Sequence, residues 1–211
     1  MRPMPVWYHE TYTEGISRSA RFPRDRYRML RERLNDLHGT GLICIESPEP
    51  VVRDTLLIAH EQDYVDRFLS GSLDAKEVRR IGLEPWTGAF LPRTMRIIGG
   101  AVEALAHVTR FGGIAANMAG GTHHSHRSFG SGYCVFNDLA ICALLARDEH
   151  AYERIAVMDL DVHQGDGTAT ILEGEEGIIT ISVHGEKNFP FRKAKSDHDF
   201  PLPNGTEDEG Y

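Results

Sequence analysis

Short apolar segments bounded by glycine alternate along the chain with longer stretches whose apolar residues recur at helical spacing. Such alternation is typical of an α/β fold with a largely parallel sheet. The segments "RIAVMDL" and "GIITISV" are nearly continuous in apolar or β-branched residues, as expected of strands covered on both faces. The strand-like and helix-like segments together are 6–10, 27–37, 41–47, 63–71, 93–110, 112–118, 136–150, 154–163, 167–174 and 177–185.

Length and composition narrow the class of protein. A chain of 211 residues, 41% hydrophobic and 26% charged, fits one ordinary globular domain. With 23 Lys and Arg against 31 Asp and Glu, the net charge is −8, which disfavours bulk electrostatic binding of nucleic acid or of an anionic membrane. We therefore expect neither nucleic acid nor a membrane among the partners.

Location follows from what the sequence lacks. No apolar run approaches the roughly 20 residues of a membrane span, and the first residues contain no signal-peptide core. The three cysteines, Cys44, Cys134 and Cys142, are an odd number without CxxC spacing. These features favour reduced thiols and, by default, a cytoplasmic location.

Two segments leave alternatives open. Residues 71–94 form a long excursion that carries Trp86, and this excursion is either a lid or a packed surface loop. Near the end, Thr206 is followed three residues later by Glu209, a pattern that begins helices. No helical stretch follows, which suggests that the sequence is part of a longer domain; a polar tail is the alternative.

The strand-like segment 154–163 ends in Asp159, Asp161 and His163. Residues two apart in a strand point to the same face, so these three side chains share one side. Open parallel sheets bind ligands at the carboxyl ends of their strands, and neighbouring carboxylates there repel unless a cation or hydrogen-bond donors offset them. A divalent metal would satisfy this site.

Spacing alone also allows ordinary structural roles. Asp-x-His at a strand end can cap a turn, and two ligands do not complete a zinc site, which normally has three from the protein. Asp166, in "QGDGT", can equally cap a helix that begins near Thr168. A second group of residues is needed to decide.

That second group is the glycine-rich loop 119–133, which carries His123 and His124 side by side after a strand-like segment. The imidazole pKa lies near neutrality, so a pair of histidines can divide the work of general base and general acid. His126 is interpreted as loop surface.

The motifs "GGTHHSHRSFGSGYCVFND", "MDLDVHQGDGTATI" and "ISVHGEKNFPF" together resemble the zinc-dependent histone deacetylase family, of the arginase/deacetylase fold. The resemblance extends over most of the chain. Gln164 stands where many members carry a second histidine, which makes the chain more similar to the class IV branch and its bacterial relatives. The resemblance implies a three-layer α/β fold with a mostly parallel sheet.

The resemblance also implies the bound ions. Zn²⁺ would be held by Asp161 and His163, and by a second aspartate from a later loop, and would activate water against the amide of an acylated lysine or acetylated amine. A structural K⁺ would use Asp159, Asp161 and carbonyls near His163, with Ser182 and Val183.

By similarity, His124 would be the general base and His123 would act mainly electrostatically. Asp159 would orient His123 and Asp166 would orient His124. The resemblance further implies an acyl tunnel walled by Gly132, Tyr133 and either Phe191 or Phe189, the first of these two phenylalanines being preferred.

In the family, the second aspartate ligand, a glycine-rich loop and an oxyanion-donating tyrosine lie beyond position 211. We therefore expect residues 1–211 to be the N-terminal portion of a single deacetylase domain, with a fold incomplete at its C-terminal end, and to be inactive or nearly so alone, unless another chain completes the fold. A catalytically dead module that binds acyl-lysine or a partner is the alternative. A ureohydrolase is disfavoured by "GGTHH". The sequence does not distinguish acetyl-lysine, longer acyl-lysines and acetylpolyamines as substrates.

Overall fold

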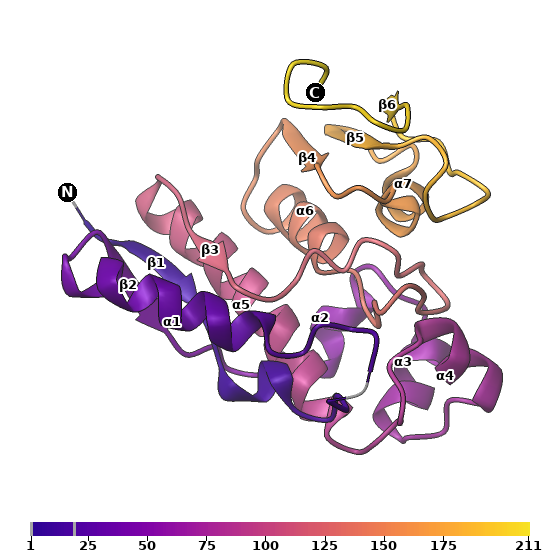
Figure 1. Ribbon diagram of the computed structural model, residues 1–211, viewed down its shortest axis with the longest axis horizontal. Coiled ribbons are helices and arrows are strands. Elements are labelled where there is room, and N and C mark those ends of the chain that lie inside the picture. Colours follow the sequence, from indigo (N-terminus) through magenta and orange to yellow (C-terminus); the bar gives the residue numbers. More distant parts are fainter. Residues whose placement is uncertain (1, 19) are drawn as a thin grey trace.

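The computed structural model describes residues 2–18 and 20–211, in which strands and helices alternate (Figure 1). In order, the elements are β1 (Met4–Trp7), η1 (Glu10–Thr13), α1 (Arg26–Gly39), β2 (Ile43–Glu46), α2 (Arg53–Leu57), α3 (Gln62–Leu69), α4 (Ala75–Ile81), α5 (Phe90–Phe111), β3 (Ala116–Asn117), α6 (Asp138–Asp148), β4 (Ile155–Asp159), α7 (Asp166–Leu172), β5 (Ile178–Gly185) and β6 (His198–Leu202). The α/β class predicted from the sequence is confirmed.

The strands form two three-stranded sheets, ordered β2-β1-β3 and β4-β5-β6. Every pairing between the described strands is parallel, as the alternation of segments predicts. The sequence did not predict a division into two sheets. The division arises because, among the described residues, no pairing joins β3 to β4. Figure 1 shows β1–β3 at the left and β4–β6 at the upper right.

Helices α5 and α6 connect the two sheets. Helix α5 packs against β1, β3 and α6, and α6 packs against β4 and α7. Gly99 of α5 permits a close approach, since a Cβ there would lie 1.9 Å from the carbonyl oxygen of Glu49. Both sheets are therefore anchored to one apolar core, which positions the loops after β3 and β4 beside each other.

One face of β4 is apolar and open. Met158, Leu160 and Val162 are 62%, 55% and 54% exposed, whereas Val157 is buried against the core. Alternation thus continues past the end of β4 and sends Asp159, Asp161 and His163 to the other side, as predicted. Parallel sheets are usually covered on both faces, so this exposed face is unusual.

The excursion at residues 71–94 is packed against the body. It contains α4, which begins with a capping box between Asp74 and Glu77. Trp86 stacks on Phe90 at a ring distance of 5.0 Å and contacts Phe68 edge to face at 6.1 Å. Of the two interpretations, the structure therefore favours a packed segment.

Among the described helices, none has the length and apolarity needed to cross a membrane.

Candidate active site

The loop after β3 presents the tandem histidines and is held in place by Asp138, the first residue of α6. The Asp138 carboxylate accepts hydrogen bonds from the backbone nitrogens of Gly121 and Thr122 and from the Thr122 hydroxyl. Gly120 has a φ of 131°, and a Cβ there would lie 2.4 Å from Asp138 Oδ2. The glycine pair thus lets the chain turn tightly around this carboxylate.

Asn137 joins the histidine loop to α6 and α7. Its side chain caps α6 by accepting a hydrogen bond from Ala140 N. Its Nδ2 donates to the carbonyl of Ser125 at 3.1 Å and to Thr168 Oγ1 at 3.0 Å. All of these groups are buried, so the network fixes the histidine loop relative to the elements that follow β4.

His60, between α2 and α3, clamps the same loop from the other side. Its Nδ1 donates to the carbonyl of His126 at 2.9 Å, and its Nε2 accepts from Asn137 N at 2.9 Å. Because an acceptor at Nε2 must be unprotonated, this geometry requires the neutral ring. Burial lowers the pKa of His60 to about 4.

We predict a pH-dependent loss of stability from His60. Below pH 6.5 the unfolded chain binds a proton that the folded chain does not accept until about pH 4. The free energy of unfolding should therefore fall by up to about 3 kcal/mol over this window from His60 alone. Urea denaturation of wild type and His60→Gln at several pH values measures the difference, and the same slope in both proteins would contradict the prediction.

Each tandem histidine is paired with a carboxylate from the segment around β4. His123 Nδ1 lies 2.5 Å from Asp159 Oδ2, and His124 Nδ1 lies 2.7 Å from Asp166 Oδ1. The two imidazole rings are 4.0 Å apart. Gly165 makes room for the first pair, since a Cβ there would lie 2.2 Å from Asp159 Oδ2. The structure thus brings together the four residues expected to act in catalysis.

The environments of the two histidines push their pKa values apart. Burial acts to lower the pKa of His123, but the Asp159 hydrogen bond and the charges of Asp159 and Asp161 outweigh it, and the pKa is raised. At His124 burial prevails, aided by the charge of His123, and lowers the pKa despite Asp166. Of the two rings, His123 is therefore the more readily protonated and His124 the more readily neutral.

Asp166 does not cap a helix, which corrects one of the two interpretations. Helix α7 begins at Asp166 itself, and its N-cap is Gly165. The Asp166 carboxylate instead accepts from His124 and, at 3.3 Å, from His126 Nε2. Burial raises the pKa of Asp166, but these two hydrogen bonds outweigh it and lower the pKa to about 2. Asp166 is therefore an anion at neutral pH.

The sequence interpretation missed His126. It was expected to be loop surface, yet its Nδ1 is 2.8 Å from Thr170 Oγ1 and its ring stacks on Phe129 at 4.4 Å. It thereby fixes the second oxygen of Asp166. A histidine two positions after a tandem pair is the only sequence signal for this contact.

Asp161 and His163 lie at the exposed side of the paired histidines. His163 Nδ1 is 2.9 Å from Asp161 Oδ1, and His123 Nε2 is 4.0 Å from the same oxygen. The side chains of Asp161 and His163 are 52% and 43% exposed. Burial raises the pKa of Asp161, but the His163 backbone N–H and nearby histidines outweigh it and lower the pKa. An anionic oxygen and an imidazole nitrogen thus converge here.

This pair fits part of a zinc site. Carboxylate oxygen and imidazole nitrogen are both zinc ligands, and catalytic zinc commonly has three ligands from the protein. Within residues 2–18 and 20–211, no group of three or more His, Cys, Asp or Glu is arranged to hold a metal ion. Asp161 and His163 therefore supply two donors, and the set needs a third.

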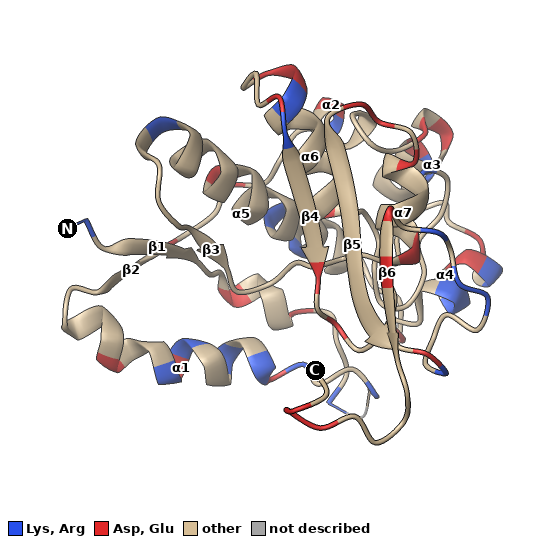
Figure 2. Cartoon of the chain, turned by 90° about the horizontal axis from the view of Figure 1, so that it is seen from above, with Lys and Arg blue, Asp and Glu red and all other residues tan. Residues whose placement is uncertain are grey.

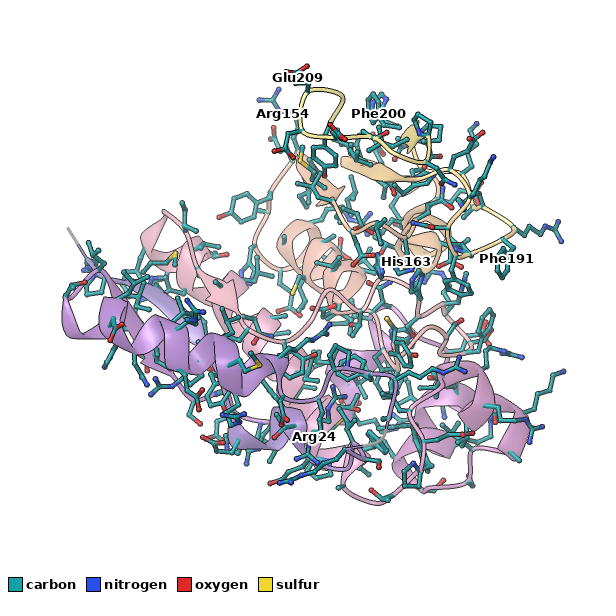
Figure 3. The ribbon with its side chains drawn as sticks, viewed as in Figure 1. Arg24, Arg154, His163, Phe191, Phe200 and Glu209 are labelled. Carbon is teal, nitrogen blue, oxygen red and sulfur yellow. The ribbon has the colours of Figure 1, made fainter. Side chains whose placement is uncertain are left out.

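The histidines open into a cavity of about 1450 Å³. Tyr133 and Gly132 line it as predicted; Gly132 has a φ of 53°, and a Cβ there would lie 2.5 Å from the His124 ring. Of the two candidate phenylalanines, Phe189 lines the cavity, with its ring 4.8 Å from His124. Phe191, the preferred candidate, is 92% exposed, does not line the cavity and lies at the outer edge of the molecule (Figure 3). Phe189 therefore replaces Phe191 as a wall.

Comparison with known proteins identifies the family of this chain. The family model of the histone deacetylase domain matches residues 20–211, nearly the whole chain. The chain belongs to the histone deacetylase family. The resemblance found in the motifs is thereby confirmed, and the paired histidines and the Asp161–His163 pair lie within the matched region.

Three relatives illustrate the similarity, two from bacteria and one from an archaeon. The chain is 41% identical over 210 residues to an uncharacterised protein of Picosynechococcus sp., an alignment that covers 98% of the chain and 68% of the relative. It is 30% identical to the acetoin utilization protein AcuC of Staphylococcus aureus, covering 69% and 41%. It is 27% identical to a probable deacetylase of Archaeoglobus fulgidus, covering 98% and 61%. The chain thus spans about two thirds or less of these relatives.

Proposed function

We propose that this chain forms part of a zinc-dependent deacetylase, an enzyme that removes an acetyl or longer acyl group from an N-acylated amine such as acyl-lysine. One observation carries the proposal: His123 and His124, each paired with an aspartate and with opposed pKa shifts, line a single cavity together with the Asp161–His163 donor pair. This combination supplies both a place for a metal ion and groups that transfer protons. Membership of the histone deacetylase family supports the same reaction class.

Asp161 and His163 would hold the zinc ion. Bound zinc supplies Lewis acidity that polarises an amide carbonyl and lowers the pKa of water. A structural K⁺ is also part of the proposal. It would bind where Asp159 of β4 lies opposite Ser182 of β5 in the sheet.

His124 is the general base in this proposal. Its Nδ1 is occupied by Asp166, so its Nε2 is the atom that accepts a proton from the attacking water and returns it to the leaving amine. The lowered pKa keeps this nitrogen free near neutral pH. His123 is held by Asp159, which raises its pKa, and in its protonated form would stabilise negative charge on the substrate oxygen.

The count of metal donors bears on activity. Two donors bind zinc less firmly than three, so we propose that residues 1–211 alone turn over little or no substrate, unless another chain supplies the missing ligand. The exposed apolar face of β4 supports a covering partner. The same count favours, as a second candidate, a module that binds acyl-lysine without hydrolysing it.

Zinc titration and an activity assay test the proposal. Isothermal titration should show one zinc ion bound per chain, and the complete gene product should release acetate from an acetyl-lysine peptide only when zinc is present. A chelator should abolish the release, and added zinc should restore it. Zinc-independent hydrolysis, or binding of the peptide without zinc and without turnover in the complete product, would favour the second candidate.

A further inference from the structure

Arginines surround the mouth of the active-site cavity. Arg21 lines it from the segment before α1, Arg26 lines it as the first residue of α1, and Arg79 and Arg80 line it from the last turn of α4. All four are exposed. Figure 2 shows these two basic segments, at the start of α1 and on α4. The protein as a whole carries a net charge of −8, so this cationic rim opposes the overall charge.

The rim arginines are not neutralised by the protein. In the described part of the chain, no carboxylate oxygen lies within 4.0 Å of any of the four, whereas Arg53, Arg67 and Arg147 all form ion pairs elsewhere. Two rim arginines are positioned by aromatic rings instead. Arg26 lies 4.4 Å from the Phe22 ring, and Arg80 lies 4.5 Å from the Phe129 ring. The rings orient these cations and leave their charge available.

Arg93 extends the positive charge into the cavity. The residue is 4% exposed, and its Nε donates to the carbonyl of Tyr12 at 2.9 Å. No described carboxylate pairs with it within 4.0 Å either. Among the residues that the structure describes, two acids line the cavity, Glu84 and the proposed zinc ligand Asp161, against five arginines. Negative charge is therefore concentrated at the histidine end of the cavity, where Asp159, Asp161 and Asp166 lie, and the rim is short of it.

Such a surface selects its ligands by charge. Opposite charges attract a ligand and align it, while like charges at a rim suppress binding. Acetylpolyamines and lysine-rich peptides bring positive charge to this rim and would be repelled. An acidic ligand would supply the counter-ions that the protein lacks.

We propose that the substrate is an acylated lysine within an acidic peptide segment, whose Asp and Glu side chains pair with Arg21, Arg26, Arg79 and Arg80. This inference rests on the proposed function and specifies its substrate. The exposed position of the four arginines, on two elements more than 50 residues apart in sequence, suits an extended chain that crosses the mouth of the cavity.

Two fluorescent acetyl-lysine peptides test the inference. They differ only in flanking residues, Asp and Glu in one and Lys and Arg in the other, and their binding to the zinc-loaded chain is measured by fluorescence anisotropy. At low salt the acidic peptide should bind about 10-fold tighter or more, because several exposed ion pairs form together. The preference should shrink as salt is added, since rim charges are screened.

Charge-removing variants assign the effect to the rim. Arg79→Gln/Arg80→Gln should reduce the preference several-fold. The matched control Arg33→Gln/Arg154→Gln removes two exposed charges that do not line the cavity and should leave the preference unchanged; Arg154 lies at the far end of β4 (Figure 3). Thermal melting checks that both variants fold.

The outcomes separate the inference from the function. Equal affinity of the two peptides, or no binding of either, overturns the inference, as does an unchanged preference in the Arg79/Arg80 variant. A third peptide, acidic but without the acetyl group, tests acyl recognition. If it binds as tightly as the acetylated acidic peptide, the proposed function fails; if acetylation strengthens binding and flanking charge does not, only the inference fails.

Discussion

Replacing His163 with alanine is expected to weaken zinc binding by at least about 100-fold and to remove zinc-dependent turnover. Loss of a group that merely orients a ligand costs about 10- to 100-fold in metal affinity, so loss of a ligand should cost no less. Only Asp161 would remain of the donor pair. Isothermal titration of the 211-residue chain measures affinity, and acetate release by the complete gene product measures turnover.

The control for this variant is His38→Ala, which removes an exposed histidine at the end of α1. It should leave zinc affinity unchanged. His163 is 43% exposed, so its loss should shift the melting temperature little, and the effect on zinc cannot then be attributed to unfolding. Unchanged zinc affinity in His163→Ala would show that the metal binds elsewhere.

Replacing His124 with alanine is expected to lower kcat for deacetylation by about 100- to 10,000-fold, the usual contribution of a general base. Its Nε2 is the proposed proton acceptor, and Asp166 holds the ring in place through its Nδ1 at 2.7 Å. Zinc affinity should change little, because the donor pair remains. Steady-state kinetics on the complete gene product at saturating zinc measures the change, and KM should stay within a few-fold.

Comparison with His123→Ala makes this prediction specific. The pKa of His123 is raised, and its proposed role is electrostatic, so His123→Ala should lower kcat but leave His124 able to accept the proton. Asp166→Asn should lie close to His124→Ala, because it removes the anion that holds the base. A His124→Ala enzyme more active than His123→Ala would reverse the two roles.

Local sequence predicted the strand end correctly. The alternation around β4 places Asp159, Asp161 and His163 on one side and Met158 on the other, and the structure has this arrangement. A two-residue period reflects backbone geometry that each strand carries by itself. The motifs also identified the histidine loop. The glycines that mark this loop in the sequence are the ones that let its backbone turn around the Asp138 carboxylate.

Local sequence did not determine which neighbours the loops would meet. Phe189 and Phe191 are two residues apart and chemically identical, yet only Phe189 reaches His124. Asp166 had an equally good role as a helix cap, and His126 had no evident partner. Each outcome depends on how α7 and the loop after β5 pack against the histidine loop. For His126, the partner Asp166 is 40 residues away in the sequence.

The sequence alone determined the α/β class, the parallel pairing, the family and the identity of the paired histidines and carboxylates. Periodicity acts within a few residues, so the class and the parallel pairing can be read locally, whereas the family and the roles of the histidines and carboxylates follow from the resemblance of the motifs. Only the tertiary structure decided the division into two sheets, the wall formed by Phe189, the bridge from His126 to Asp166 and the cationic rim. Those features join segments distant in sequence, and side-chain packing in three dimensions determines which of them meet.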